Sequence, residues 1–415
     1  MLPLDASKIL IVDGVEDDPK MRARMERLRT GISAPEVCRV DDAQLNAEVG
    51  ELMAHCRGRH GMHSDIRPVV IFNRFRLDDS EEERKRRIEA YPELCGLRFN
   101  GYSGFDWRES GSLAWRKKMG LVCQPAWQVH TIVGCHFRCA YCNLGWFVNI
   151  LLNIEDFIDH LDQNIAEHCP KQTLFQWDNY TDAPCFEPEY GASKLFVEYF
   201  AKRPGQALEL YVGKSDHVDY LLDYDHQGHT VCCWSLSSQT QSTAFEPGSA
   251  PMAARIASIR KCQDAGYPVR VRLSPIIPVR NWESENREML QQLFAEVDPD
   301  VVTIETIRFL DYAAMEESFD LSLLDDAFVQ AMKDNAGGEW LQGCEVPDGY
   351  RKRVYDLVIG EIERLSPKTP YAFCRESSSM WANYQEGFAR HGQNADRYLC
   401  NCAAHCAPAT AGALA

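Results

Sequence analysis

Short apolar runs alternate with amphipathic stretches along the chain from about residue 126 onward. Six of these runs have the length and composition of buried β-strands, and each is followed by a polar loop or by a loop with Gly or Pro. They cover residues 127–133, 173–178, 208–213, 230–236, 269–274 and 301–307. This alternation predicts repeated β/α units and therefore a parallel sheet.

Two of the intervening stretches have clear helical periodicity. Between the first two predicted strands, apolar residues follow a helical stripe and Asn153 is placed to cap the helix. The stripe consists of Ile154, Phe157, Ile158, Leu161 and Ile165. The second helix covers residues 252–265 and is expected to end at Gly266, because glycine is the usual residue just past a helix C-terminus.

The first part of the chain is patterned as a small α/β segment. Residues 8–12 and 68–72 are short strand-like runs, and residues 20–28 form a charged helical pattern. Residues 78–92 are dense in charges of both signs, which is typical of a solvated helix face rather than of a binding patch.

These patterns predict an α/β fold whose core is an open partial (β/α)6 barrel. Six β/α units are too few for a closed eight-stranded barrel, and ligands of such folds gather at the C-terminal ends of the strands. We expect residues 1–118 to form an N-terminal α/β segment, residues 119–312 the barrel core, and residues 313–415 a helical C-terminal region with a Cys-rich tail.

Composition narrows the classes of function. The 415 residues contain 44 Lys and Arg against 61 Asp and Glu, and the net charge of −17 argues against a dedicated nucleic-acid scaffold. No apolar run approaches the roughly 20 residues that cross a bilayer, so we expect no membrane partner and a cytoplasmic location. Seventeen cysteines without a secretory signal indicate metal or redox chemistry rather than a disulfide framework.

Three cysteines stand close together directly after the first predicted core strand. Cys135, Cys139 and Cys142 have the spacing CxxxCxxC in the segment GCHFRCAYC. Three neighbouring thiolates need a distant fourth ligand to complete a zinc site, but they can hold three irons of a [4Fe–4S] cluster and leave the fourth iron open. The open iron is where a substrate or cofactor would bind.

This loop resembles that of the radical S-adenosylmethionine (SAM) superfamily, whose CxxxCxxC motif follows the first strand of a partial barrel. The resemblance implies that the amino and carboxyl groups of SAM chelate the open iron and that one electron then splits a sulfonium bond. It also implies that Tyr141, between the second and third cysteines, packs near the adenine.

A narrower resemblance, to the spore photoproduct lyase family, covers most of residues 5–312. It rests on VGKSDHVDYLL at residues 212–222, on residues 233–269, and on LSPIIPVRNW at residues 273–282. Lys214 and Ser235, at the ends of the third and fourth predicted strands, match the cofactor-binding Lys and Ser of that family, and both can hydrogen-bond a ribose or a carboxylate. Glu246, in FEPGS, matches the FEPGT of the family, and its Pro-Gly turn indicates a fixed loop.

The chain departs from the family at positions that carry its chemistry. Alignment of FQWDNYTD places Asn179 where the lyases have the cysteine that returns a hydrogen atom to thymine, and Asn143 where they have a second tyrosine. Cys185, six residues after Asn179, is an alternative donor. Both departures count against DNA repair, although Arg270, Arg272, Arg280 and Arg308 could form a local basic cleft.

The candidate catalytic residues are therefore Tyr141, Asn179 and Cys185. The glycine-rich motif that usually binds the methionyl amine is missing, and Asp178 and Asp182 are candidates for that task, with a capping or turn role as the alternative.

A second group of thiols lies near the C-terminus. Cys374 is followed by Cys400, Cys402 and Cys406 in LCNCAAHC. With His405, this group could bind an auxiliary iron–sulfur cluster, a zinc ion or a thiophile such as trivalent arsenic, or it could bind nothing.

The leading hypothesis is a radical SAM enzyme that acts on a small molecule and draws electrons from a flavodoxin- or ferredoxin-type reductant. A variant of it transfers the aminocarboxypropyl group of SAM to a soft acceptor such as trivalent arsenic. The alternatives are a DNA repair lyase of the spore photoproduct type and a non-enzymatic metal-binding module.

Overall fold

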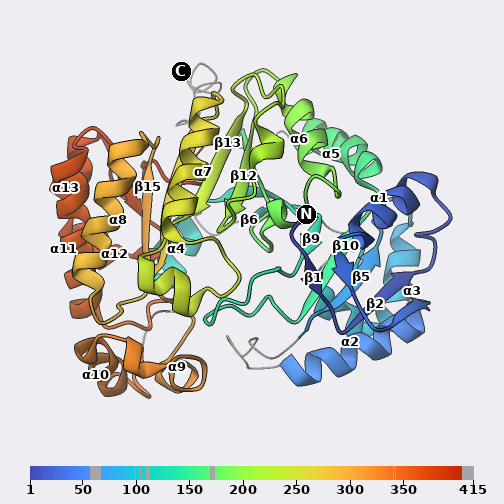
Figure 1. Cartoon of the computed structure of the whole chain (residues 1–415), viewed down its shortest axis with the longest axis horizontal. Helices are drawn as coiled ribbons and strands as arrows, with labels where there is room; N and C mark the ends of the chain where they lie inside the picture. Colours follow the sequence, from blue (N-terminus) through green and yellow to red (C-terminus); the bar gives the residue numbers. More distant parts are fainter. Residues whose placement is uncertain are drawn as a thin grey trace.

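The chain forms a mixed α/β fold built around two β-sheets (Figure 1). The computed structural model describes residues 1–56, 67–98, 100–102, 104–108, 113–168, 173–339, 341 and 343–403. Figure 1 places the N-terminal elements at the right and the helices of the C-terminal part at the left. Of the helices described, none is long and apolar enough to cross a membrane.

The small sheet has the strand order β4-β2-β5-β10-β9. Its strands are β2 (Lys8–Val12), β4 (Val37–Val40), β5 (Val69–Asn73), β9 (Ile132–Val133) and β10 (Phe147–Leu151). All neighbours are parallel except β9, which runs antiparallel to β10. The accompanying helices are α1 (Pro19–Arg29), α2 (Asp42–Cys56), α3 (Glu81–Ala90) and the 3-10 helix η1 (Pro92–Leu97). Beside them, β1 (Leu4–Asp5) pairs with β3 (Ile32–Ser33).

The large sheet has the strand order β16-β15-β14-β13-β12-β11-β8-β6. It consists of β6 (Phe105–Arg108), β8 (Ala126–Val129), β11 (Leu174–Trp177), β12 (Ala207–Gly213), β13 (Thr230–Ser235), β14 (Val269–Ile276), β15 (Val302–Thr306) and β16 (Tyr371–Phe373). Seven strands are parallel and β6 is antiparallel to β8. Among the described strands, β6 and β16 form the two edges, so the sheet is open.

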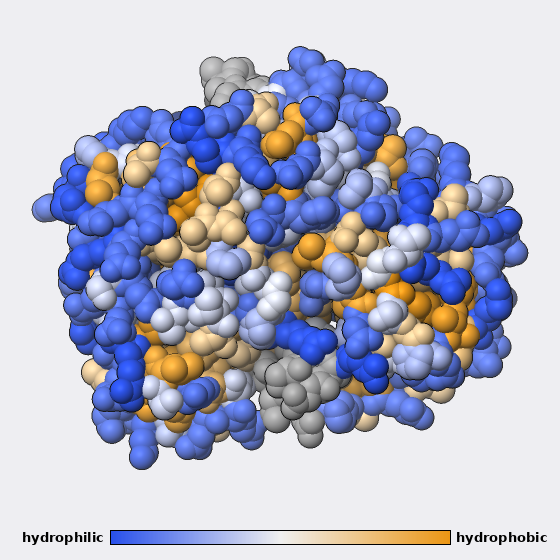
Figure 2. Space-filling view, in the orientation of Figure 1, coloured by the Kyte–Doolittle hydropathy of each residue, from blue (hydrophilic) through white to orange (hydrophobic). Residues whose placement is uncertain are grey.

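Helices connect the strands of the large sheet and pack on one another. They are α5 (Ile154–His168), α6 (Ala192–Ala201), α7 (Met252–Asp264), α8 (Trp282–Glu296) and α11 (Asp348–Leu365). The shorter elements are α4 (Leu113–Met119), α9 (Tyr312–Ser318), α10 (Asp326–Asp334), α12 (Ser378–Asn383), α13 (Gln385–Arg390), the 3-10 helix η2 (Ala183–Phe186), and the pair β7 (Leu121–Val122) with β17 (Glu376–Ser377). Figure 2 shows one face of the molecule, and hydrophilic side chains cover most of it, in keeping with the high charge of the chain.

The local sequence explains several element boundaries. Asp18 accepts hydrogen bonds from the backbone of Lys20 and Met21 at the start of α1, and Gly266, with φ of 91°, follows the predicted end of α7. The charged run at residues 78–92 is mostly the exposed helix α3, as predicted. Asn153 precedes α5, but its Oδ1 accepts the N–H of Phe75 at 2.7 Å, so this side chain joins two elements.

All six predicted core runs are strands, but the first is divided between the two sheets. Residues 127–133 break at His130 and Thr131, where Asp178 accepts hydrogen bonds from His130 Nδ1 and from the N–H of Thr131. The large sheet also gains β6 and β16 from the segments expected to lie outside the core, and the small sheet takes β9 and β10 from the core. Both sheets therefore take strands from both sides of the predicted boundary at residue 118, and the large sheet also takes β16 from beyond residue 312, while the division into domains stays a prediction.

Candidate active site

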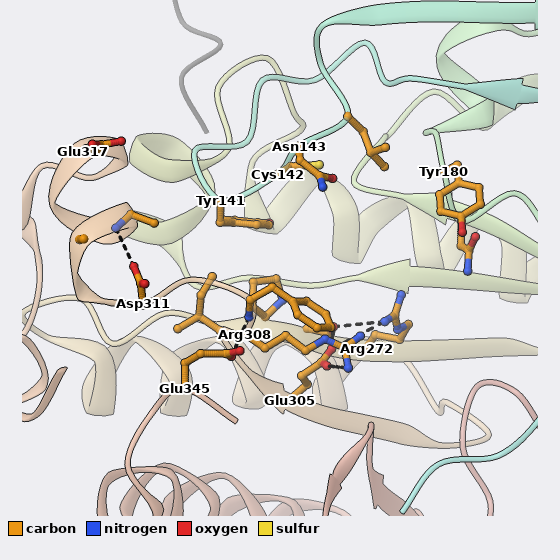
Figure 3. A pocket seen from close by; sticks show the side chains of 18 of the residues that line it. Tyr141, Cys142, Asn143, Tyr180, Arg272, Glu305, Arg308, Asp311, Glu317 and Glu345 are labelled. Atoms are coloured by element: carbon orange, nitrogen blue, oxygen red, sulfur yellow. Dashed lines mark hydrogen bonds and ion pairs between the residues drawn. The ribbon is translucent and has the colours of Figure 1, made fainter. Parts of the chain in front are cut away.

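A cavity of about 950 Å³ opens at the C-terminal ends of the strands of the large sheet (Figure 3). On one side lie Tyr141, Cys142 and Asn143, and facing them lie Arg272, Glu305 and Arg308. The wall is completed by Arg98, Leu144, Asn179, Tyr180, Ser274, Pro275, Ile307, Phe309, Asp311, Ala313, Ala314, Glu317 and Glu345.

The cysteine loop begins directly after β9 at a position that only glycine fits. Gly134 has φ of 108°, and a Cβ on it would lie 1.8 Å from the carbonyl oxygen of Phe147. The loop is closed by a hydrogen bond from the N–H of Cys135 to the carbonyl of Leu144 at 2.9 Å. The N–H of Ala140 bonds the carbonyl of Phe245 at 2.8 Å, which ties this loop to the FEPGS loop. The three cysteines are therefore held on a fixed backbone.

Burial favours the protonated form of all three thiols. It raises the pKa of Cys139 to about 12, that of Cys135 well above the ordinary value for cysteine, and that of Cys142 above it as well. Within the described part of the chain, no three side chains of His, Cys, Asp or Glu converge as they would on a single metal ion. Each cysteine of a [4Fe–4S] cluster binds a different iron, so the cysteine sulfurs lie farther apart than they do around a single metal ion. This finding therefore concerns sites for a single ion.

Several neighbouring groups oppose the effect of burial on these pKa values and favour the thiolates. Backbone N–H groups lower the pKa of Cys135 and, from Leu144 and Asn143, that of Cys142. The ammonium group of Lys214 lowers the pKa of both Cys139 and Cys142. Donors aimed at cysteine sulfurs are what a bound iron–sulfur cluster uses, so the loop fits that group.

A buried ion pair fixes Tyr141 between the cysteines. The Tyr141 hydroxyl donates to Glu246 Oε1 at 2.7 Å, and Arg255 Nη2 donates to Glu246 Oε2 at 2.6 Å. Both charged side chains are fully buried, and the Ser237 hydroxyl donates to the same carboxylate at 2.8 Å. Burial and the neighbouring carboxylate raise the pKa of Tyr141 well above its usual value, which keeps the hydroxyl protonated. Sequence reasoning assigned Glu246 only a fixed loop and missed its partner Arg255.

Lys214 and Ser235 lie near the cysteine loop, at the ends of adjacent strands. The Lys214 ammonium nitrogen is 5.6 Å from the centre of the Tyr141 ring. Ser235 is the last residue of β13, and its carbonyl accepts Arg255 Nη1 at 3.1 Å. The structure therefore brings Lys214, Tyr141 and the cysteines together, and Ser235 joins them through Arg255.

Asp178 has a structural task that competes with the cofactor-binding role expected for it. It is fully buried after β11, and His130 Nδ1 lies 2.6 Å from its Oδ1. Its oxygens also accept the N–H groups of Thr131, Ile132 and Tyr180 at 2.9, 3.3 and 3.1 Å. With these partners the carboxylate holds the chain at the break between β8 and β9. This is the turn role that the sequence left open as the alternative for Asp178.

Asp182 and Cys185 also lie behind the cavity wall. Asp182 accepts the backbone N–H of Lys214 at 2.6 Å, and the thiol of Cys185 bonds its other oxygen at 3.4 Å. Burial raises the pKa of Asp182 to about 7. Cys185 is fully buried in η2 and is not among the residues that line the cavity, so the geometry does not favour it as a hydrogen-atom donor.

Two amides take the positions at which the chain departs from the lyases. Asn143 and Asn179 both line the cavity, and the buried Oδ1 of Asn179 has no hydrogen-bond partner among the described residues. Beside them, the Arg98 guanidinium lies 4.7 Å from the centre of the Tyr180 ring. All four of these residues line the cavity.

The expected basic cleft is only partly present. Arg272 and Arg308 line the cavity, but Glu305 lies 3.9 Å from the first and 2.5 Å from the second. Arg270 bonds backbone carbonyls near the C-terminus, and Arg280 bonds the carbonyl of Ser322. Glu305 was missed by sequence reasoning, although its place at the end of a strand was a usable signal.

The described C-terminal cysteines lie behind the cavity wall, and the charges of Glu305, Arg308 and Arg272, which line the cavity, act on the thiol of Cys374. Cys400 and Cys402 are buried among side chains of the large sheet, and Cys374 directly follows β16. None of the three lines the cavity. Cys406 and His405 lie outside the described residues.

An open parallel sheet with a three-cysteine loop at its strand ends is the arrangement expected for a radical SAM protein. Residues 125–314 match the family model described as "Spore photoproduct lyase". The resemblance read from the sequence is therefore confirmed for this region.

Individual relatives agree with this match. The chain is 30% identical over 184 residues to spore photoproduct lyase of Bacillus subtilis (strain 168), which is 42% of this chain and 54% of the relative. It is 29% identical to the enzyme of Geobacillus sp. (strain Y412MC61), with the same two coverages. The chain thus spans about half the length of these curated relatives.

Solved structures share the fold over a longer stretch. Spore photoproduct lyase complexed with dinucleoside spore photoproduct superposes with a TM-score of 0.61, 20% identity, and coverage of 89% of this chain and 99% of the other. A spore photoproduct lyase mutant with bound AdoMet and dinucleoside spore photoproduct has a TM-score of 0.61, 18% identity, and coverages of 89% and 98%.

Proposed function

We propose that this chain is a radical SAM enzyme whose substrate occupies the cavity at the strand ends of the large sheet. Cys135, Cys139 and Cys142 would hold a [4Fe–4S] cluster, and SAM would bind beside Lys214, Ser235 and Tyr141. When bound there, the cluster and SAM would supply one-electron cleavage of a sulfonium bond. The observation that carries the proposal is that Tyr141 and Cys142 belong both to the cysteine loop and to the cavity wall.

The residues around the loop have separate tasks in this proposal. Lys214 places a positive charge beside the cysteines and Tyr141, where the carboxylate of SAM would be held. The pair Glu246–Arg255 keeps Tyr141 in place without a net buried charge. Asn143, Asn179 and Tyr180 then face the substrate.

A thymine lesion of the spore photoproduct type is the substrate that the relatives favour. The curated relatives carry that name, and a solved relative holds the dinucleoside lesion. The aromatic ring of Tyr180 and the guanidinium of Arg98, both on the cavity wall, would suit a base and a backbone phosphate.

A second candidate is a small organic substrate, as favoured by the sequence alone. The observation behind it is the chemistry of the cavity wall, where Cys142 is the sole thiol among the described residues and Asn179 replaces the expected donor. An amide does not give up a hydrogen atom to a carbon radical as a thiol does, so the radical would need another fate. Transfer of the aminocarboxypropyl group to a soft acceptor gains no support, because Cys400 and Cys402 do not reach this cavity.

One anaerobic experiment tests the proposal and separates the candidates. The chain is reconstituted with iron and sulfide, reduced with dithionite and incubated with SAM, with and without dinucleoside spore photoproduct. We expect 5′-deoxyadenosine in both samples. Repair of the dinucleoside would favour the lyase, and 5′-deoxyadenosine without repair would favour another substrate. Methylthioadenosine as the main product would indicate aminocarboxypropyl transfer instead.

A further inference from the structure

The buried sulfur of Cys402 is surrounded by hydrogen-bond donors. Arg108 Nη2 lies 3.0 Å from it, Gln176 Nε2 lies 3.3 Å away and Asn401 Nδ2 lies 3.7 Å away. The donors come from β6, from β11 and from the neighbouring residue, and Cys402 is only 5% exposed. A guanidinium against a sulfur favours the thiolate over the thiol.

Cys400 lies next to this sulfur in the same turn. The N–H of Ala403 bonds the carbonyl of Cys400 at 3.0 Å, which closes a β-turn over residues 400–403. The N–H of Cys402 donates to the sulfur of Cys400, with 3.4 Å between the nitrogen and the sulfur. Such a turn places its first and third residues within the Cα separation that a disulfide requires.

The turn is anchored inside the large sheet. Arg270 Nη1 and Nη2 donate to the carbonyls of Asn401 and Ala403 at 2.5 and 2.8 Å. The N–H of Asn401 bonds the hydroxyl of Thr303 at 3.1 Å, and its side-chain amide bonds the Tyr211 hydroxyl at 2.6 Å. Side chains from several strands therefore enclose the two sulfurs and hold them in one geometry.

The surroundings suit a redox pair better than a metal site. Arg108 and Arg272 would repel a cation bound at Cys402, and both also lower the pKa of this thiol. The nearby carboxylate of Glu209 acts on that pKa in the opposite direction. Among the described residues, no third ligand of the His, Cys, Asp or Glu type joins the two sulfurs. The buried oxygens Gln176 Oε1, Glu209 Oε1 and Asn401 Oδ1 have no protein partner in the described part of the chain, which leaves polar sites for a water-sized oxidant.

We propose that Cys400 and Cys402 form a peroxide-sensitive dithiol site that closes to an intrachain disulfide, with Cys402 as the attacking sulfur and Cys400 as the resolving one.

The reaction balances with hydrogen peroxide as the oxidant. The Cys402 thiolate attacks one peroxide oxygen, the O–O bond breaks, and the leaving hydroxide takes a proton to become water. The resulting sulfenic acid is attacked by the sulfur of Cys400, the S–S bond forms, and a second water leaves with the proton of Cys400. Two thiols and one peroxide thus give one disulfide and two waters.

Peptide mapping tests this site on the unaltered full chain. The cluster-loaded protein receives brief, stoichiometric peroxide, is quenched with N-ethylmaleimide under denaturing conditions and is digested with trypsin. Cleavage after Arg397 releases a C-terminal peptide with Cys400, Cys402 and Cys406. We expect two fewer hydrogens, one maleimide instead of three, and fragment ions that place that maleimide on Cys406. Three maleimides, or a bond that includes Cys406, would overturn the proposal.

Variants assign the two roles. In C400S, dimedone should label Cys402 after peroxide treatment, because the sulfenic acid has no resolving thiol, whereas in C402S Cys400 should stay unlabelled. R108Q should slow the oxidation about tenfold or more, since the thiolate loses its guanidinium. The matched control R260Q removes an exposed arginine of α7 and should leave the rate unchanged. Equal labelling in both serine variants, or equal rates in R108Q and R260Q, would contradict the assigned roles.

Discussion

Glu246 illustrates how one buried carboxylate organises the candidate active site. It joins Tyr141 of the cysteine loop to Arg255 of α7, and the carboxylate and the guanidinium group are both fully buried. A buried charge without a partner costs several kcal/mol, so the ion pair and its hydrogen bonds are formed together or not at all. The position of Tyr141 beside the cysteines therefore depends on a residue more than 100 positions away.

The three loop cysteines carry the most direct prediction at the residue scale. Replacing Cys135, Cys139 or Cys142 with Ala should remove the iron–sulfur absorbance of the reconstituted protein and its cleavage of SAM, because two thiolates cannot hold the cluster. Iron analysis and chromatography measure both effects. The control C95A replaces an exposed cysteine of η1 and should retain both properties. Retained SAM cleavage in the triple Ala variant would refute the assignment.

Lys214 is expected to act on cofactor binding. K214A should weaken SAM affinity about tenfold to a hundredfold, because one charge-assisted hydrogen bond is worth about 1.5–3 kcal/mol. S235A should have a smaller effect. Spectroscopic titration of the reduced cluster gives both affinities, and K261A, which alters an exposed lysine of α7, is the matched control. Unchanged affinity in both K214A and S235A would remove these residues from the site.

At the scale of elements, Asp42 ties α2 to the neighbouring helix. Its carboxylate receives Arg87 of α3 at 2.7 and 2.8 Å and Arg76 at 3.1 Å. Burial alone would raise the pKa of Asp42, but the two guanidinium groups hold it below its usual value. The carboxylate of a group with a depressed pKa stabilises the fold above the unfolded pKa of about 3.9, and this contribution is lost as pH falls through the folded value.

D42N should therefore lower the free energy of unfolding by about 1–2 kcal/mol at pH 7. The difference from the unaltered protein should shrink as the pH falls below the unfolded pKa of about 3.9 and through the lower folded pKa of Asp42. Urea unfolding at pH 7 and pH 3 measures this. A difference of the same size at both pH values would mean that the ion pairs are not its source.

Whether a strand could be predicted from the sequence depended on its length and on its neighbours in the fold. The six core strands have buried apolar runs that periodicity detects, but β16 has only three residues and β6 is an antiparallel edge strand, so neither stands out. The division of residues 127–133 depends on Asp178, 45 or more positions later, which no local pattern shows.

The same distinction holds for the residues of the candidate active site. The spacing of three cysteines predicted the cysteine loop, and the family resemblance predicted Lys214 and Ser235, because both signals lie in local sequence. The roles of these residues stay predictions. The pair Glu246–Arg255 and the carboxylate of Glu305 depend on which strand ends meet, and this required the tertiary structure.

At the scale of the whole molecule, the two sheets are interleaved in the chain. Residues 126–129 belong to the large sheet, residues 132–133 and 147–151 to the small sheet, and residues 174–177 again to the large sheet. The small sheet therefore cannot be completed by the N-terminal segment alone. A fragment of residues 1–118 lacks β9 and β10 and would expose the paired edge of β5.

We expect this fragment to show no cooperative thermal transition, whereas the full chain should. Circular dichroism over a temperature ramp compares the two. A fragment of residues 1–151, which supplies both missing strands, serves as the comparison and should retain more ordered structure. A sharp transition in residues 1–118 alone would show that the small sheet folds without β9 and β10.

The cysteine loop, with Lys214 and Tyr141 beside it, is proposed to support radical chemistry on SAM. The most direct measurement is the anaerobic reaction of the reconstituted, dithionite-reduced protein with SAM, analysed by chromatography beside the triple Ala variant of Cys135, Cys139 and Cys142. We expect 5′-deoxyadenosine from the unaltered protein and none from the variant. Equal amounts from the two proteins, or no cleavage of SAM by a protein with a full complement of iron, would contradict it.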